Sequence, residues 1–304
     1  MAYSGIGGQA VMEGVMMRCD RDVAVAVRLT DGTIHVDKKK VKEKPDWVEK
    51  VPIVRGIYNF FHSLVVGMGA LFDSSAYFDE DPNEKKDKVN DKKETLEIGG
   101  TLLISFALAI GIFVAIPFYL SGFLNKWITS PEILAFAEGV VRLIIFLLYV
   151  WIIGKTEDIR RVFMYHGAEH KCINCIEDGK DLTLENVRSS SRFHKRCGTS
   201  FIFIVFIISI FVFMFIRSDI RLVQLGMRIL LMPLIAGISY EFIRLAGRSN
   251  NPIVGLLSLP GLWIQRLTTK EPDDDMIRVG IASVEAVFDW KKFLEKQGGT
   301  DEKK

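Results

Sequence analysis

The sequence TLLISFALAIGIFVAIPFYLSGFL, residues 101–124, decides the class of fold. It runs for 24 residues without a charged side chain, and about 20 apolar residues are enough for a helix to cross a bilayer. Outward from it, hydrophobic residues reach 49% of the chain and are concentrated in further blocks. We therefore predict a mainly α-helical membrane protein with four transmembrane helices. The other three predicted spans are 133–153, 199–216 and 222–243.

Two of these spans contain charged residues. Glu138 and Arg142 lie in the second span, and Arg228 and Glu241 lie in the fourth. A charge within the hydrocarbon is costly, so these side chains should face the interior of the helix bundle. Glu138 and Arg142 are four residues apart and are expected to pair. A structural ion pair is the favoured interpretation, and a conduction or substrate role is the alternative.

Lysine and arginine are distributed unevenly between the connecting segments. Residues 81–100 carry five and 154–198 carry nine, whereas 125–132 carries one and 217–221 carries two. The positive-inside rule then places both termini and the long middle loop in the cytoplasm. That compartment is reducing, so cysteines there should be thiols or metal ligands and not disulfides.

Outside the spans, several segments have a pattern of their own. Residues 23–36 alternate apolar and polar side chains around Asp31-Gly32, which predicts a β-hairpin. Residues 53–72 are apolar but interrupted by glycine, and we expect an interfacial or re-entrant helix. Residues 253–267 contain Pro260-Gly261 and are too short to cross, so we expect them to lie along the interface. Residues 273–296 have apolar side chains at helical spacing and should pack on the cytoplasmic part.

These patterns divide the chain into six parts. Residues 1–78 form a small α+β unit, with a Gly-rich and hairpin region and an interfacial helix, and 79–98 form a charged linker. Two spans lie in 99–153, a cytoplasmic His/Cys loop in 154–198, two further spans in 199–245 and a cytoplasmic C-terminal region in 246–304.

The cysteines of the middle loop have the spacing of metal ligands. Cys172 and Cys175 are separated by two residues, and so are His194 and Cys197, with 18 residues between the two pairs. Each short turn lets two ligands converge on one ion, so the pattern predicts a structural zinc site. Iron is the alternative metal, because thiolates also bind it.

The sequence HGAEH at 166–170 suggests a second kind of site. Thr156 followed by two acids indicates a helix start, and the helix would place His166 and His170 on one face. Two such imidazoles can share a metal, with Glu169 beside them as a general base, in the H-x-x-E-H order of a metalloprotease group. A third ligand is needed, and Glu241 is a candidate. A single composite site that joins these histidines to the cysteines is an equal alternative, and a role without metal is a third.

Five long motifs are similar to the YqhQ-like family of bacterial membrane proteins, a family of unknown function described as predicted metal-dependent enzymes. The resemblance covers nearly the whole chain. It implies a multi-pass inner-membrane protein with a metal site formed by His166, His170, Cys172, Cys175, His194 and Cys197, and it implies no substrate. Cys19 stands where the family is expected to have a small residue, which argues against Cys19 as a ligand. The motifs are GGQAVMEGVMMR at 7–18, HGAEHKC at 166–172, RFHKRCGTSF at 192–201, SYEFIRLAGR at 239–248 and PGLWIQRLTTKEPDDD at 260–275.

Three classes of function follow. The leading hypothesis is a membrane-embedded, metal-dependent hydrolase that acts on a cytosolic or lipid-headgroup substrate, with Glu169 as the base. The second is a membrane scaffold in which zinc only folds the 154–198 loop. The third is a transporter lined by the charges within the spans, for which four spans are few unless the chain forms a homo-oligomer. The formal net charge of +2, without a broad patch of one sign, argues against a nucleic-acid partner.

Overall fold

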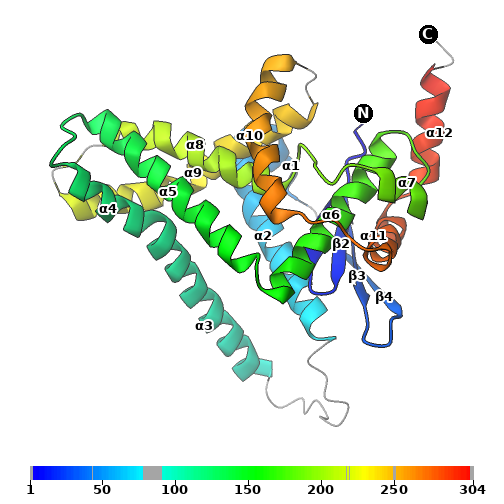
Figure 1. Ribbon diagram of the computed structural model, residues 1–304. Helices are drawn as coiled ribbons and strands as arrows, with labels where there is room; N and C mark the ends of the chain where they lie inside the picture. The colour runs from blue at the N-terminus through cyan, green and yellow to red at the C-terminus, as the bar shows by residue number, and fades with distance from the viewer. Residues whose placement is uncertain are drawn as a thin grey trace.

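The computed structural model describes residues 3–42, 44–77, 91–216, 218, 220–248 and 251–301. The chain forms a group of long helices beside a smaller unit that is built around an antiparallel sheet (Figure 1). Residues 79–90 of the predicted charged linker 79–98 lie outside the described residues. The small α+β unit predicted at the N-terminus is therefore present, next to a mainly helical remainder.

The sheet is a four-stranded meander in the order β1-β2-β3-β4. Strands β3 and β4 form the hairpin that the alternation at 23–36 predicts, with Val27 opposite His35. Gly32 in the connecting turn has a φ of 85°, a conformation that glycine adopts without strain. The Gly-rich segment upstream forms the other two strands, which the sequence pattern did not predict. The bounds are β1 Gly7–Val11, β2 Gly14–Cys19, β3 Asp22–Arg28 and β4 Ile34–Lys40.

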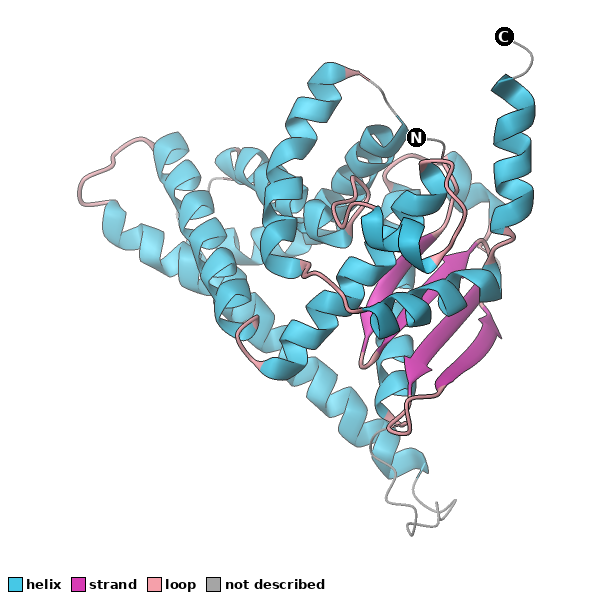
Figure 2. Cartoon of the chain, turned by 45° about the vertical axis from the view of Figure 1, so that its right-hand side comes forward, coloured by secondary structure: helices cyan, strands magenta, loops and turns pink. Residues whose placement is uncertain are grey.

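Both faces of the sheet are covered by helices (Figure 2). Val15, Met17 and Ala26 pack on one face against α6 (Glu157–Glu177) and α11 (Asp274–Val287). Met16, Val25 and their neighbours pack on the other face against Ala70 of α2. Because successive side chains of a strand point to opposite faces, β2 and β3 are buried along almost their whole length.

The amphipathic helix expected at 273–296 packs on the sheet as predicted, but it ends at Val287. A separate helix, α12, covers Trp290–Asp301. Of two short helices, α7 (Leu184–Ser189) packs on α6 and α11, whereas α1 (Asp46–Lys50) packs on α2.

Three helical segments of the described chain are long and apolar enough to cross a membrane, which suggests a membrane protein. They are Gly99–Leu124, Pro131–Ile153 and Arg221–Ala246. The fourth predicted span, 199–216, corresponds to a helix of 17 residues, which is shorter than the other three and stays a prediction. The helices concerned are α3 (Asp91–Ile110), a π-helical turn (Gly111–Ala115), α4 (Ile116–Leu124), α5 (Pro131–Ile153), α8 (Gly198–Met214) and α9 (Arg221–Arg248).

Helix α2 (Val54–Ser75) joins the sheet to the long helices. Its C-terminal half covers the sheet, while its N-terminal half crosses α9 at Gly56 and Gly237. A Cβ on Gly56 would lie 2.6 Å from the carbonyl oxygen of Gly237, so the two backbones are in direct contact. Helix α10 (Pro252–Thr268) packs mainly on α8. The segments expected to be interfacial thus connect the two parts of the fold.

The charged residues of the predicted spans have partners. Nη2 of Arg142 donates to Oε1 of Glu138 over 2.8 Å, which confirms the predicted pair. Arg228 of α9 binds the other oxygen of the same carboxylate. Glu241 is separate from this group and accepts from Nε of Arg55 over 2.7 Å.

Substituting alanine at two glycines of α2 tests the contact with α9. Gly56→Ala should lower the free energy of unfolding by about 1–3 kcal/mol, because the backbone of α9 must move away. Gly69→Ala in the same helix has no atom within 4 Å of its Cβ and should instead stabilise by about 0.5–1 kcal/mol. Thermal unfolding in detergent measures both variants. Equal effects would contradict the close approach.

Candidate metal centre

Helix α6 carries the two histidines of the HGAEH motif. It begins after Thr156, whose backbone is extended, and has Glu157 and Asp158 in its first turn, as predicted. His166 and His170 therefore lie one turn apart, with their ring centroids separated by 4.4 Å. This confirms that they share a face of the helix.

The third member of the group is Cys197, which lies immediately before α8. Its Sγ is 3.2 Å from Nε2 of His166. One ligand atom from each of these three residues lies within 4.8 Å of the others. His170 and Cys197 are buried, and the side chain of His166 is 18% exposed. Among the described residues, no other group of three His, Cys, Asp or Glu side chains converges in this way.

Both imidazoles are oriented by backbone carbonyl groups. Nδ1 of His166 lies 2.9 Å from the carbonyl oxygen of Thr268, and Nδ1 of His170 lies 2.6 Å from that of Arg192. A carbonyl oxygen can only accept, so each Nδ1 carries the proton and donates it. In the neutral rings, both Nε2 lone pairs are left free on the side of Cys197. Metal-binding histidines are held in this way.

The charge distribution favours a thiolate at Cys197. Burial alone would raise the pKa of this thiol, but the neighbouring His166 and His170 rings, through their charge and hydrogen bonds, hold it well below its usual range. Burial also opposes the charged form of His166, yet the Cys197 thiolate outweighs it and raises the pKa of His166 to about 9. When no metal ion lies between Cys197 and His166, the proton of the Cys197 thiol moves toward the His166 imidazole. The group therefore presents a thiolate, the form that binds metals.

Glu169 lies beside the same group. Its Oε2 is 3.9 Å from Nε2 of His166 and 3.6 Å from Nε2 of His170. The carboxylate is buried beneath β1, where a Cβ on Gly8 would lie 2.7 Å from Cγ of Glu169. Glycine at this position lets the strand lie directly on the acid. The N-terminal Gly-rich motif is thereby connected to the HGAEH motif.

The separation of Cys197 and His166 suits two ligands of one tetrahedral ion. Zinc at its usual bond lengths separates a sulfur and a nitrogen ligand by about 3.5 Å. The observed distance of 3.2 Å between Sγ and Nε2 is close to that value. A ligand set of two imidazoles and one thiolate fits zinc, and it leaves one position for water, for a substrate or for Glu169.

The structure does not gather the predicted set of Cys172, Cys175, His194 and Cys197. Cys172 packs in the core of the sheet unit, where a Cβ on Gly280 would lie 2.9 Å from its Sγ. The thiol of Cys175 points to the carbonyl oxygen of Asp181 over 3.3 Å. Burial raises the pKa of both thiols, which favours the neutral form. Both cysteines lie within α6 and belong to the core that α6 forms with the sheet and α11.

His194 is next to the group but has other partners. Its Nε2 lies 3.5 Å from Oε2 of Glu177, and its backbone is held by Gln265 of α10. Glu177 also accepts hydrogen bonds from Ser4 and Arg196. The two rings of His170 and His194 are 5.6 Å apart, with His194 turned toward the acid. His194 thus supports the wall of the site.

Glu241, the third ligand considered from sequence, is bound by Arg55 at the contact of α2 with α9. Cys197 takes that place beside the histidines. Helix periodicity relates residues within one helix and says nothing of which distant segment packs against it. The HxxC spacing, however, had already marked Cys197 as a ligand.

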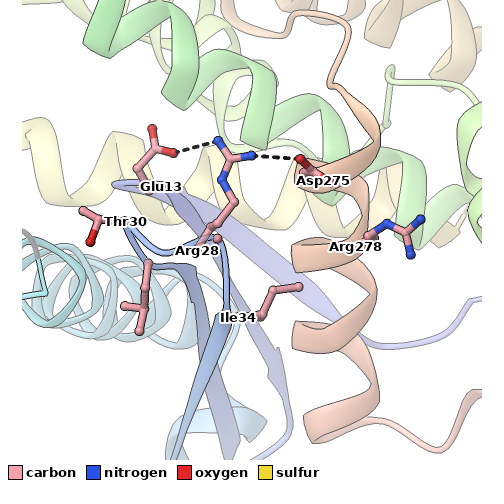
Figure 3. Close-up of a pocket in the computed structure, with 8 residues that line it drawn as sticks. Glu13, Arg28, Thr30, Ile34, Asp275 and Arg278 are labelled. Carbon is pink, nitrogen blue, oxygen red and sulfur yellow. Dashed lines mark hydrogen bonds and ion pairs between the residues drawn. The ribbon is translucent and has the colours of Figure 1, made fainter.

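Glu13 is a polar anchor that the sequence analysis missed. It lies at the turn between β1 and β2 with a φ of 47°, and it binds Arg161 and Tyr165 of α6. On its other side, Arg28 connects Glu13 to Asp275 at the rim of a pocket of about 410 Å³ (Figure 3). Charges of opposite sign pair across this pocket. Glu13 thus connects the sheet to α6, and Arg28 connects it to α11.

Residues 51–290 match the family described as "Protein of unknown function (DUF1385)". The chain belongs to this family. It is 36% identical over 286 residues to a protein of Bacillus subtilis (strain 168) described as "Uncharacterized protein YqhQ", with 91% of this chain and 90% of that protein covered. No solved structure matches the chain.

The pH dependence of stability tests the role of Glu177. Burial opposes its charge, but His194, Arg196 and Ser4 together lower its pKa to about 2 from the ordinary 4.5. The stabilisation is therefore present above pH 4.5 and is lost as the pH falls toward 2. Glu177→Gln should remove stability on the order of 3 kcal/mol at neutral pH, with a smaller difference from the wild type in acid.

Glu271→Gln is the matched control. Glu271 also contacts two cations, Lys171 and Arg192, but its side chain is 59% exposed. Its loss should change the free energy of unfolding by less than about 1 kcal/mol. Urea titrations of the detergent-solubilised proteins between pH 7 and pH 3 measure these differences. A constant difference for Glu177→Gln across that range would contradict the assignment.

Proposed function

We propose that this chain is an integral membrane metalloenzyme whose ion, zinc or alternatively iron, is held by His166, His170 and Cys197. The observation that carries the proposal is the pair of Nδ1 contacts to the carbonyl groups of Thr268 and Arg192. They turn both Nε2 atoms toward one thiolate. Three protein ligands with one open position are typical of catalytic zinc sites.

Glu169 is the proposed general base. When bound at this position, zinc lowers the pKa of water and polarises carbonyl or phosphoryl oxygens. Glu169 has an oxygen within 4 Å of both imidazoles, and no arginine or lysine neutralises it in the described structure. It is thus able to accept a proton from a nucleophile next to the ligands and to return it to a leaving group. The reaction class that fits is hydrolysis.

The proposed location is the cytoplasmic surface of the inner membrane. Cys197 immediately precedes α8 and Thr268 ends α10, so the group lies where the sheet unit meets the long helices. The distribution of lysine and arginine supports four spans, with both termini in the cytoplasm. A substrate would then come from the cytosol or from the lipid headgroup region.

A scaffold with a structural metal is the second candidate, and the burial of the group favours it. His170 and Cys197 are almost fully buried. If Glu169 completed the coordination, the ion would only fasten α6 to the start of α8. A transporter is not favoured, because Glu138, Arg142 and Arg228 are engaged with one another.

Metal content distinguishes the two sets of ligands predicted for this chain. Purified wild-type protein should hold about one zinc per chain, and His166→Ala and Cys197→Ser should lose it. Cys175→Ser should retain it, because Cys175 points into the 178–183 loop. Cys19→Ser is the matched control for removal of a thiol, and circular dichroism checks folding. Loss of zinc in Cys175→Ser with retention in His166→Ala would restore the set of Cys172, Cys175, His194 and Cys197.

Cobalt substitution tests the role of Glu169. If the chain is an enzyme, Glu169→Gln should keep the metal. The visible spectrum of the cobalt-substituted protein should then change with pH and with added cyanide, because one coordination position is open. In the wild type the midpoint of the pH change should be higher than in Glu169→Gln, because the neighbouring negative carboxylate disfavours the loss of a proton from bound water. Loss of metal in Glu169→Gln, or a wild-type spectrum that neither pH nor cyanide changes, would identify a closed structural site.

A further inference from the structure

A second polar site lies at the end of the long helices that is remote from the sheet. It is a pocket of about 310 Å³ between the end of α4, the start of α5, the end of α8 and the start of α9. In Figure 1 this is the end near the label of α4, far from the strands. Three charged side chains line it, Glu138, Arg221 and Arg228. Its other lining residues are mostly apolar.

The charges at the base of this pocket do not balance. The carboxylate of Glu138 is shared by Arg142 and Arg228, one guanidinium on each oxygen. All three side chains are no more than 3% exposed. Arg221 adds a third guanidinium at the exposed rim, next to Gly122 of α4. The described lining residues thus have two positive groups for one negative group, and Arg142, which lies behind the lining, shares that same carboxylate.

The buried guanidiniums also have unused hydrogen-bonding capacity. Nε of Arg142 and Nε of Arg228 are buried without an acceptor. The ring of Phe213 lies about 5 Å from the Cζ atoms of both arginines, and Ser209 accepts one bond from Arg142. These contacts stabilise the cations but bring no negative charge. Buried arginine normally pairs with an acid or with another anion.

The position of the group makes this imbalance costly. Arg228 and Glu138 are each seven residues inside their helices, which corresponds to a depth of about 10 Å. Both helices are long and apolar enough to cross a membrane. At such a depth an uncompensated charge is expensive, and charged residues there usually mark a binding site.

From this geometry we infer that the pocket is a binding site for an oxyanion of the phosphate type, either free or as the headgroup of a phospholipid. Guanidinium groups recognise phosphate through paired N–H donors. Arg221 at the rim and Arg228 at the base provide such donors from one helix, with two turns between them. The apolar lining next to them suits an acyl chain, and the opening suits a free ion.

The site is independent of the His/Cys group, which lies at the opposite end of α8. It is tested with full-length protein in detergent. Equilibrium dialysis measures binding of radiolabelled inorganic phosphate. Native mass spectrometry compares the retention of phosphatidylglycerol with that of a diacylglycerol of the same acyl chains, which lacks the phosphoglycerol headgroup. Binding of free phosphate identifies a soluble oxyanion as the ligand, and selective retention of phosphatidylglycerol alone identifies a headgroup.

Arg221→Gln should weaken whichever ligand binds by about tenfold, as expected for one charge-assisted contact. Because Arg221 is exposed at the rim, this variant keeps the fold, whereas Arg228→Gln leaves Glu138 with one partner. Lys126→Gln is the matched control: Lys126 is exposed at the same end but does not line the pocket. Its effect should stay below about twofold. The inference would be overturned if the wild type neither binds free phosphate nor prefers the phospholipid. Equal effects of Arg221→Gln and Lys126→Gln on binding would also overturn it.

Discussion

The C-terminal half of α6 is almost completely removed from water, although it carries Glu169, His170, Lys171 and Glu177. Charged and polar groups can be buried only when partners satisfy them. The partners come from distant segments: β1 covers Glu169, the 188–194 loop accepts from Lys171 and His170, and Ser4 donates to Glu177. This one requirement holds the sheet, the loop and the start of α8 around a single helix.

Patterns within one element could be predicted from the sequence. The hairpin around Asp31-Gly32, the start of α6 after Thr156 and the pairing of Glu138 with Arg142 depend on periodicity and local turn chemistry, and the structure has all three. The apolar segments were equally clear, since their length is a direct constraint of the bilayer. For the same reason α8, the shortest of them, does not count with the three long apolar helices.

Contacts between distant segments could not be predicted in this way. The cysteine spacing of 172–175 resembles a zinc knuckle, but on a continuous helix those thiols face Gly280 and Asp181. Gly167 would count against a helix by propensity, yet a Cβ there would lie 2.0 Å from the carbonyl oxygen of Lys270. Only glycine lets the chain after α10 cross α6 so closely. A residue type that is unfavourable locally can thus be required by tertiary packing.

The sheet unit draws on three parts of the chain that long apolar helices separate. The strands come from residues 7–40, α6 from 157–177, and α11 from 274–287, beyond the last long helix. During synthesis one face of the sheet therefore stays incompletely covered until the long apolar helices that separate the strands from α11 have been made and α11 itself has emerged. Folding of the unit therefore requires synthesis to have passed α11. A truncated chain would expose Val15, Met17 and Ala26, the kind of apolar surface that quality-control proteases and chaperones recognise.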